Sequence, residues 1–241
     1  MFIIFKKEIK TFFDSLNGIV IFSIFFLSNS LFVWISPSTN IFQYGLSSLD
    51  VFFDIVPYIF IFLIPSITMK TISEEKKLGT FEILLAQPVS HYKIILGKFL
   101  SCWFISIMLI FFTFPYWISI YNLSNPTGNT DNLIIINSYL GLILLVGAMN
   151  SIGIFFSSIS QNQIISFLLT SFVCYVLYEG IDMINFYDSI NYGNSFFDHF
   201  TFSYHYLNFT RGILQLNSFV YFFIIILLFF YFSLNNLKHT L

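Results

Sequence analysis

The sequence predicts an all-α integral membrane protein with six transmembrane helices. Hydrophobic residues make up 57% of the 241 residues and charged residues only 9%, whereas soluble domains carry about 25% charged residues. The mean hydropathy is +0.82. Apolar runs long enough to cross a bilayer occur six times along the chain. Six spans and their connections account for a chain of 241 residues, so residues 1–241 are expected to form one membrane domain without a soluble catalytic domain.

The residues before the first run predict an amphipathic helix that lies along the membrane surface. In residues 1–17, apolar side chains recur near i, i+3, i+4 and i+7 among Lys6, Lys7, Glu8 and Lys10. A signal peptide is the alternative, but the next apolar run is too long for its hydrophobic region and no small-x-small cleavage site follows. We therefore expect an uncleaved interfacial helix.

Six apolar runs are predicted to span the membrane, because each approaches the length of about 20 residues that a spanning helix needs. They are residues 18–35, 51–69, 99–120, 133–156, 164–181 and 219–234. An even number of spans places both termini on the same side of the membrane.

A charged segment, residues 70–98, separates the second and third spans and holds eight of the 22 charged residues. Ser73 followed by two glutamates predicts a helix N-terminus, where the hydroxyl caps an amide and the carboxylates meet the positive end of the helix dipole. Gly79 is expected to break this helix, Thr80 to cap a second one, and Pro88 to end it. The segment therefore predicts two short helices outside the membrane.

The second short helix is expected to be amphipathic. Phe81, Leu84 and Leu85 fall on one face and Glu82 on another. An apolar face on a short helix with polar flanks needs a partner. The periodicity leaves two alternatives open, a separate soluble protein or the inner surface of the chain itself.

Basic residues predict the orientation of the six spans. Nine of the ten basic residues lie on the same side as the termini, and only Arg211 lies on the other side. A Lys or Arg at the bilayer centre costs about 3 kcal/mol. The termini and residues 70–98 are therefore predicted to be cytoplasmic.

The fourth span carries small residues that permit close helix approach. They are Gly141, Gly147, Ala148, Ser151 and Gly153. The sequence leaves open whether they pack within one chain or between two subunits.

Residues 182–217 are predicted to form an external re-entrant segment, because they are long and rich in Phe and Tyr for an exposed loop. Glu179 and Asp182 lie near the outer end of the fifth span, and Arg211 is the only external basic residue available to pair with either. These three residues are candidates for a gate or pathway.

Asp198, His199 and His205 suggest an alternative, an external acid–base or metal site of a membrane-embedded enzyme. Their spacing matches no metal motif, so we expect polar tips of the re-entrant segment and assign no metal. Cys102 and Cys174 lie in apolar runs and are expected to be buried free thiols.

The charged segment carries the pattern Glu75-x-x-x-Gly79-Thr80-x-Glu82-x-Leu84-x-x-x-Pro88-Val89-Ser90, followed by Lys93 and Lys98. This pattern, placed between the second and third spans, resembles the cytoplasmic signature of ABC-2-type transporter permeases. The sequence contains no G-x-x-x-x-G-K-[ST] phosphate loop, so a separate subunit is expected to hydrolyse ATP.

The resemblance implies a fold like that of type V exporters and a permease subunit that is not an enzyme. Its partners would be a cytoplasmic ABC ATPase that binds ATP and Mg²⁺, a second copy or a related permease subunit, and the lipid bilayer, with no nucleic acid and no cofactor of its own. The residues implied to couple to the ATPase are Glu74, Glu75, Gly79, Thr80, Phe81, Glu82, Leu84 and Pro88.

A narrower resemblance rests on Ser203-Tyr204-His205-Tyr206, Arg211-Gly212 and Val220-Tyr221-Phe222. Together with the charged segment, these residues are similar to the gliding-motility-associated ABC transporter permease subunits of Bacteroidetes. This resemblance implies a location in the bacterial inner membrane and a function as an exporter associated with gliding motility. A structural anchor of a surface machine, with the ATPase used for assembly, is the remaining alternative.

Overall fold

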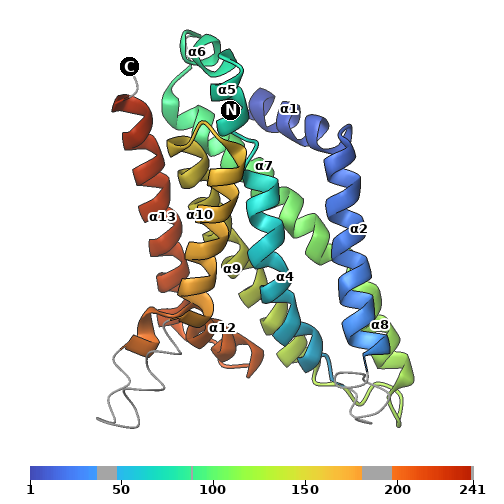
Figure 1. Cartoon of the computed structure of the whole chain (residues 1–241). Coiled ribbons are helices and arrows are strands. Elements are labelled where there is room, and N and C mark those ends of the chain that lie inside the picture. The colour runs from blue at the N-terminus through green and yellow to red at the C-terminus, as the bar shows by residue number, and fades with distance from the viewer. Residues whose placement is uncertain (37–47, 88, 181–196, 240–241) are drawn as a thin grey trace.

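The computed structural model describes residues 1–36, 48–87, 89–180 and 197–239, and these residues form helices without any strand (Figure 1). The α-helices are α1 (Phe2–Phe13), α2 (Leu16–Ser30), α4 (Asp50–Thr68), α5 (Ser73–Lys77), α6 (Thr80–Leu85), α7 (His91–Phe111), α8 (Phe114–Leu123), α9 (Asn132–Ile159), α10 (Gln163–Tyr175), α12 (Phe202–Thr210) and α13 (Leu216–His239). Two π-helical segments, η1 (Leu31–Ile35) and η2 (Val176–Gly180), continue α2 and α10, and η3 (Phe197–Phe200) is a short 3-10 helix.

Within these described residues, six helical stretches are long and apolar enough to cross a membrane, which confirms the predicted number. They are Leu16–Ile35, Asp50–Lys77, His91–Leu123, Asn132–Ile159, Gln163–Gly180 and Leu216–Leu237. The third stretch differs from the sequence prediction, because α7 begins at His91 and includes Lys98 as a fully buried side chain. Lys98 is therefore part of the packed bundle and not of the preceding loop.

The central helix of the bundle is α9, which packs against α4, α7, α10, α12 and α13. Its glycines lie at close contacts with neighbouring helices. A Cβ atom at Gly153 would lie 2.2 Å from Thr68 Oγ1 on α4, and one at Gly141 would lie 2.5 Å from Phe209 Cβ on α12. These small residues pack within the chain, which answers the question that the sequence left open.

The two ends of the bundle differ in charge. We call the end that carries α1, α5 and α6 the basic end; it lies at the top of Figure 1, and α12 lies at the opposite end.

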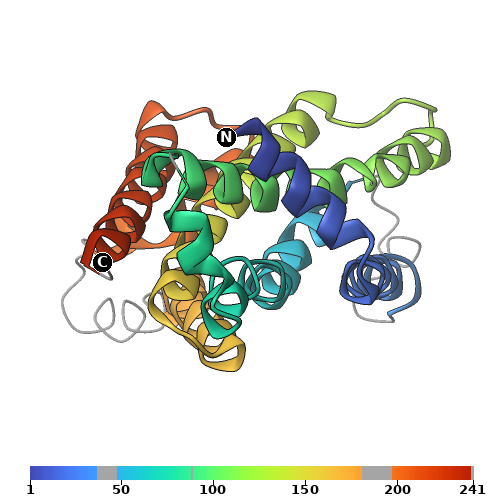
Figure 2. The ribbon, with the colours of Figure 1, turned by 90° about the horizontal axis from the view of Figure 1, so that it is seen from above.

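Seen from above, α1 crosses over α7 (Figure 2). The helix predicted before the first span is thus present as α1, although the first span already begins at Leu16. Which end faces the cytoplasm stays a prediction.

The last part of the predicted external segment forms α12, which packs against α9. Phe202, Tyr206 and Phe209 are buried there, and Tyr206 Oη donates to the Phe53 carbonyl at 3.0 Å. Residues 181–196 lie outside the described residues. Entry of this segment into the outer leaflet stays a prediction.

We expect Gly153→Ala to destabilise the protein by about 1–3 kcal/mol, because the added methyl group overpacks the contact with Thr68. Thermal unfolding of the purified protein in detergent measures this effect. Gly180→Ala is the matched control, since its nearest neighbouring atom would lie at 3.5 Å, an ordinary contact. Equal melting temperatures for the two variants would contradict the tight α4–α9 contact.

Candidate functional site

The two short helices at the basic end, α5 and α6, turn at Gly79, where φ is +69°. This left-handed conformation favours glycine because a side chain would clash with the backbone. The predicted break at Gly79 is therefore confirmed. The predicted Ser73 cap is wrong, because Ile72 precedes the helix and the Ser73 hydroxyl donates back to the Met69 carbonyl. The predicted Thr80 cap is wrong as well, because Gly79 precedes α6 and the Thr80 hydroxyl donates to the Glu75 carbonyl.

A residue from another helix replaces the missing cap. Ser157 Oγ on α9 accepts hydrogen bonds from the backbone N–H groups of Ile72 and Ser73, each at 3.1 Å. The first amides of a helix have no partner within it, so a hydroxyl at this place stabilises the start of α5. The start of α5 is thereby fixed to the central helix.

The end of α9 binds the same short helix in return. The Lys76 ammonium on α5 donates to the Ser158 carbonyl. Asn236 Nδ2 on α13 donates to this carbonyl as well, at 2.9 Å. Carbonyl groups at a helix C-terminus lack partners within the helix and attract cations. These contacts join α5, α9 and α13 at one point.

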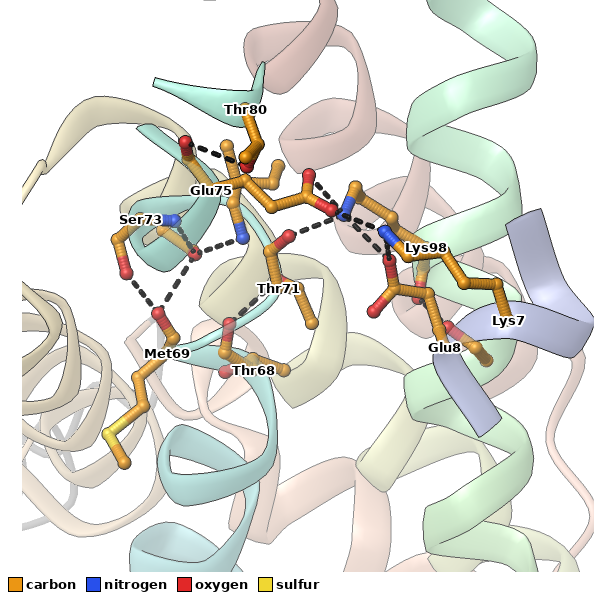
Figure 3. A network of polar contacts seen from close by, with 12 residues as sticks. Lys7, Glu8, Thr68, Met69, Thr71, Ser73, Glu75, Thr80 and Lys98 are labelled. Carbon is orange, nitrogen blue, oxygen red and sulfur yellow. Dashed lines mark hydrogen bonds and ion pairs between the residues drawn. The ribbon is translucent and has the colours of Figure 1, made fainter. Parts of the chain in front are cut away.

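Four charged side chains join α1, α5 and α7 (Figure 3). Lys98 Nζ on α7 lies 2.9 Å from Glu8 Oε1 on α1 and 2.8 Å from Glu75 Oε2 on α5. Lys7 Nζ on α1 lies 2.8 Å from the other Glu75 oxygen, Oε1. The contact of Lys98 with Glu75 is an ion pair outside hydrogen-bond geometry. We call these residues, Lys7, Glu8, Glu75 and Lys98, the ion network.

The Lys98 ammonium has two carboxylate partners and one carbonyl partner, although its side chain is completely buried. It donates hydrogen bonds to Glu8 and to the Thr71 carbonyl, and it also forms an ion pair with Glu75. The network contains two cations and two anions. Removing one partner would leave a charge in the interior without compensation, which is far more costly than the pair is stabilising.

Close packing fixes α1 next to this network. A Cβ atom at Gly97 would lie 3.2 Å from the Met1 carbonyl oxygen and 3.3 Å from the Ile4 side chain. The ring of Phe5 packs edge-on against Phe104, with centroids 5.7 Å apart. The helix α1 therefore crosses α7 one residue before Lys98, and the ion network and the helix crossing reinforce each other.

The apolar face of α6 packs against the chain itself. Phe81 is 3% exposed and joins a cluster with Ile72, Ile95, Phe99 and others, and Leu84 and Leu85 are partly buried against it. The periodicity left open whether this face meets a separate protein or the inner surface of the chain, and in the structure it meets the chain itself. A role of Phe81 and Leu84 at a partner interface stays a prediction.

Two apolar side chains that the sequence analysis did not select point outward instead. Leu78 is 67% exposed and Ile83 is 66% exposed, and Gly79, Thr80 and Glu82 are exposed beside them. We call Leu78, Thr80, Glu82 and Ile83 the exposed tip. The sequence could have indicated the exposure of Ile83, because this residue follows Glu82 and lies on the face of α6 opposite Phe81.

The other predicted coupling residues have different surroundings. Glu74 and Glu75 are partly buried, and the Glu75 carboxylate points toward α1 and α7. Pro88 lies outside the described residues. The structure thus brings Gly79, Thr80 and Glu82 to the surface of one element, while Glu75 binds groups of its own chain.

At the opposite end, the predicted ion pair between Glu179 and Arg211 is not formed. Glu179 Oε2 instead accepts a hydrogen bond from Tyr58 Oη at 2.7 Å. Arg211 ends α12 and is exposed. Asp182 lies outside the described residues, so its pairing with Arg211 stays a prediction.

His205 is held as a structural side chain. Its Nε2 bonds to the His199 carbonyl at 2.9 Å and therefore carries the proton, so Nδ1 accepts from Ser218 Oγ at 3.1 Å. The ring also stacks on Tyr221 with centroids 4.0 Å apart. Among the described residues no three His, Cys, Asp or Glu side chains are grouped to hold a metal ion. The side chain of Asp198 is outside the described part.

Among the described residues, six helical stretches long and apolar enough to cross a membrane, with two short helices at one end, define the class of multi-pass membrane proteins. A family model described as ABC-2 family transporter protein matches residues 2–234. The chain belongs to this family and is a multi-pass permease subunit of an ABC transporter, a transport component that is not itself catalytic. A search among curated proteins gives no match.

We expect Lys98→Met to destabilise the protein by about 3–5 kcal/mol, because Glu8 and Glu75 lose the cation that compensates them. Thermal unfolding in detergent measures the loss. Lys77→Met is the control, since Lys77 is exposed on α5. The double variant Lys98→Met with Glu75→Gln should lose less than the sum of the single variants. Additive losses would contradict a coupled network.

We expect the stability of the α12 end to depend on pH through His205. The pKa of His205 is lowered in the folded state, mainly because burial disfavours the charged ring. The hydrogen bond to the His199 carbonyl raises this pKa, and the His199 charge lowers it. The folded state then binds fewer protons than the unfolded state below about pH 6.5. Stability should be complete above this pH and should decrease as the pH falls below it.

Melting temperatures between pH 5 and 8 test this expectation. His205→Gln should flatten the pH profile, whereas His199→Gln should retain a decrease at low pH. A profile that is unchanged by His205→Gln would show that another group titrates.

Proposed function

We propose that this chain is one half of a dimeric ABC exporter and that the exposed tip docks into a separate cytoplasmic ATPase. The observation that carries the proposal is the pair of exposed apolar side chains, Leu78 and Ile83, on a solvent-facing element that is otherwise polar. Apolar side chains that are presented in this way mark interaction sites when polar residues surround them. Thr80 and Glu82 supply the polar rim.

The attachment of α5 supports a coupling role. Ser157 and Ser158 tie α5 to α9, Asn236 ties α13 to the same point, and the ion network ties α5 to α1 and α7. A displacement of the tip would therefore move several spans together and would not be absorbed in a loop. Such rigid-body movement is a common way in which a binding event changes the state of a transporter.

In this mechanism ATP and Mg²⁺ bind to the partner ATPase and not to this chain. Closure of two ATPases around ATP would move the two tips of the dimer, and the populations of inward- and outward-open states would shift because ATP binds the closed state more tightly. The second half would be another copy or a related permease subunit. The residues of the tip contact the partner and take no part in hydrolysis.

The distribution of lysines supports a cytoplasmic location of the basic end in a bacterial inner membrane, with both termini on that side. Lys6, Lys10, Lys70, Lys76, Lys77 and Lys93 lie at this end together with the ion network. Arg211 lies at the other end. A role in gliding motility is the particular form of export or assembly that the narrower resemblance suggests.

Co-purification with the cognate ATPase tests the docking. We expect Leu78→Glu and Ile83→Glu each to reduce ATPase recovery at least about tenfold, since a loss of about 1.4 kcal/mol in binding has this effect. Glu82→Lys should reduce recovery as well. All three variants should keep the wild-type melting temperature, because their side chains are exposed.

Leu133→Glu is the matched control, because Leu133 is 77% exposed at the opposite end of α9. Unchanged recovery for the tip variants would refute the docking. Full ATPase binding without movement of any cargo would favour the structural anchor over the exporter.

A further inference from the structure

A cavity of about 520 Å³ opens at the basic end between α1, α2, α4, α5, α6 and α7. Pockets for small ligands have volumes of roughly 300–1,000 Å³. Lys7, Glu8 and Glu75 of the ion network form part of its wall. The cavity therefore has the size of a ligand site and lies beside the contacts that hold α1 and α5.

Two charged side chains on the cavity wall have no ionic partner among the described residues. The members of the ion network neutralise one another. Lys70 and Glu74 also line the cavity and are partly buried, but neither forms an ion pair with a described side chain. The cavity thus presents one positive and one negative group to an occupant.

Most of the buried side chains that line the cavity are apolar. We call four of them the floor: Ile21 of α2, Ile67 of α4, and Cys102 and Ile105 of α7. Buried Thr71 and Ser101 also line the cavity. Ile105 follows Lys98 by seven residues, which corresponds to about 10 Å along a helix. These residues belong to membrane-spanning stretches, so the cavity extends from a polar rim into the depth of the membrane.

We propose that this cavity binds one zwitterionic phospholipid with a phosphate and a primary ammonium group. The phosphate pairs with Lys70, the ammonium pairs with Glu74, and an acyl chain covers the apolar floor. A purely apolar occupant would leave both charges without compensation. An anionic lipid would leave Glu74 without a cation, and free phosphate would not use the floor.

Native mass spectrometry of the delipidated protein measures the lipid that is retained, and it needs no ATPase. We expect phosphatidylethanolamine to bind about tenfold more tightly than phosphatidylglycerol, and millimolar inorganic phosphate not to displace it. Glu74→Gln should remove this preference, and Lys70→Gln should weaken both lipids. Lys77→Gln is the control on the same segment, outside the cavity lining, and should leave binding unchanged.

A photoreactive phosphatidylethanolamine with a diazirine in its acyl chain locates the site. We expect crosslinks on the floor residues of α2, α4 and α7. Ile105→Trp, which fills the floor, should abolish them. Ile118→Trp is the matched control, because Ile118 on α8 is 60% exposed and does not line the cavity.

Equal affinity for the two lipids, or crosslinks that Ile105→Trp and Glu74→Gln leave unchanged, would overturn the proposal. Displacement of the lipid by inorganic phosphate would overturn it too, since it would identify a simple anion site. Melting curves of each variant exclude loss of folding as the cause of lost binding. Leu78, Thr80 and Ile83 of the exposed tip line the cavity, whereas Glu82 does not. Glu82→Lys should therefore reduce ATPase recovery and leave lipid binding unchanged, so failure of the docking and failure of the lipid site are distinguished.

Discussion

A buried lysine must be compensated by anions, and this requirement organises the basic end of the molecule. Lys98 lies completely inside the bundle, and its partners Glu8 and Glu75 come from two other elements. Because an uncompensated interior charge is very unfavourable, α1, α5 and α7 have to stay together. The amphipathic N-terminal helix is therefore a structural part of the bundle as well as a surface element.

The central helix α9 supplies the second constraint. Its glycines allow α4 and α12 to approach closely. Its last turn binds the first amides of α5 through Ser157 and the Lys76 ammonium of α5 through Ser158. The short helix α5 would be unstable alone, since a single turn cannot satisfy its own terminal amides. Contacts with α9 turn this short segment into a rigid extension of the spans.

The same packing determines which groups remain available to other molecules. Phe81 is covered by the cluster around Ile72, so α6 is anchored and directs Ile83 and Leu78 outward. On the inner side, the gap enclosed by α1 and α5 keeps an apolar floor below charged walls. Leu78, Thr80 and Ile83 of the exposed tip also line this cavity, so protein docking and lipid binding are proposed for adjoining surfaces of one element. The position of that element depends on the ion network.

The sequence by itself determined the six spans, the break at Gly79 and the asymmetric distribution of lysines, because composition, periodicity and spacing are local properties of the chain. The family was indicated by the resemblance of the charged segment and is shown by the match over residues 2–234. Only the tertiary structure decided that Lys98 is buried, that Ser157 caps α5 and that Glu179 binds Tyr58. The partners in these contacts lie far apart in sequence; Glu8 and Lys98, for example, are 90 residues apart. Periodicity indicates that a helix has an apolar face, but it does not encode which distant side chain covers that face.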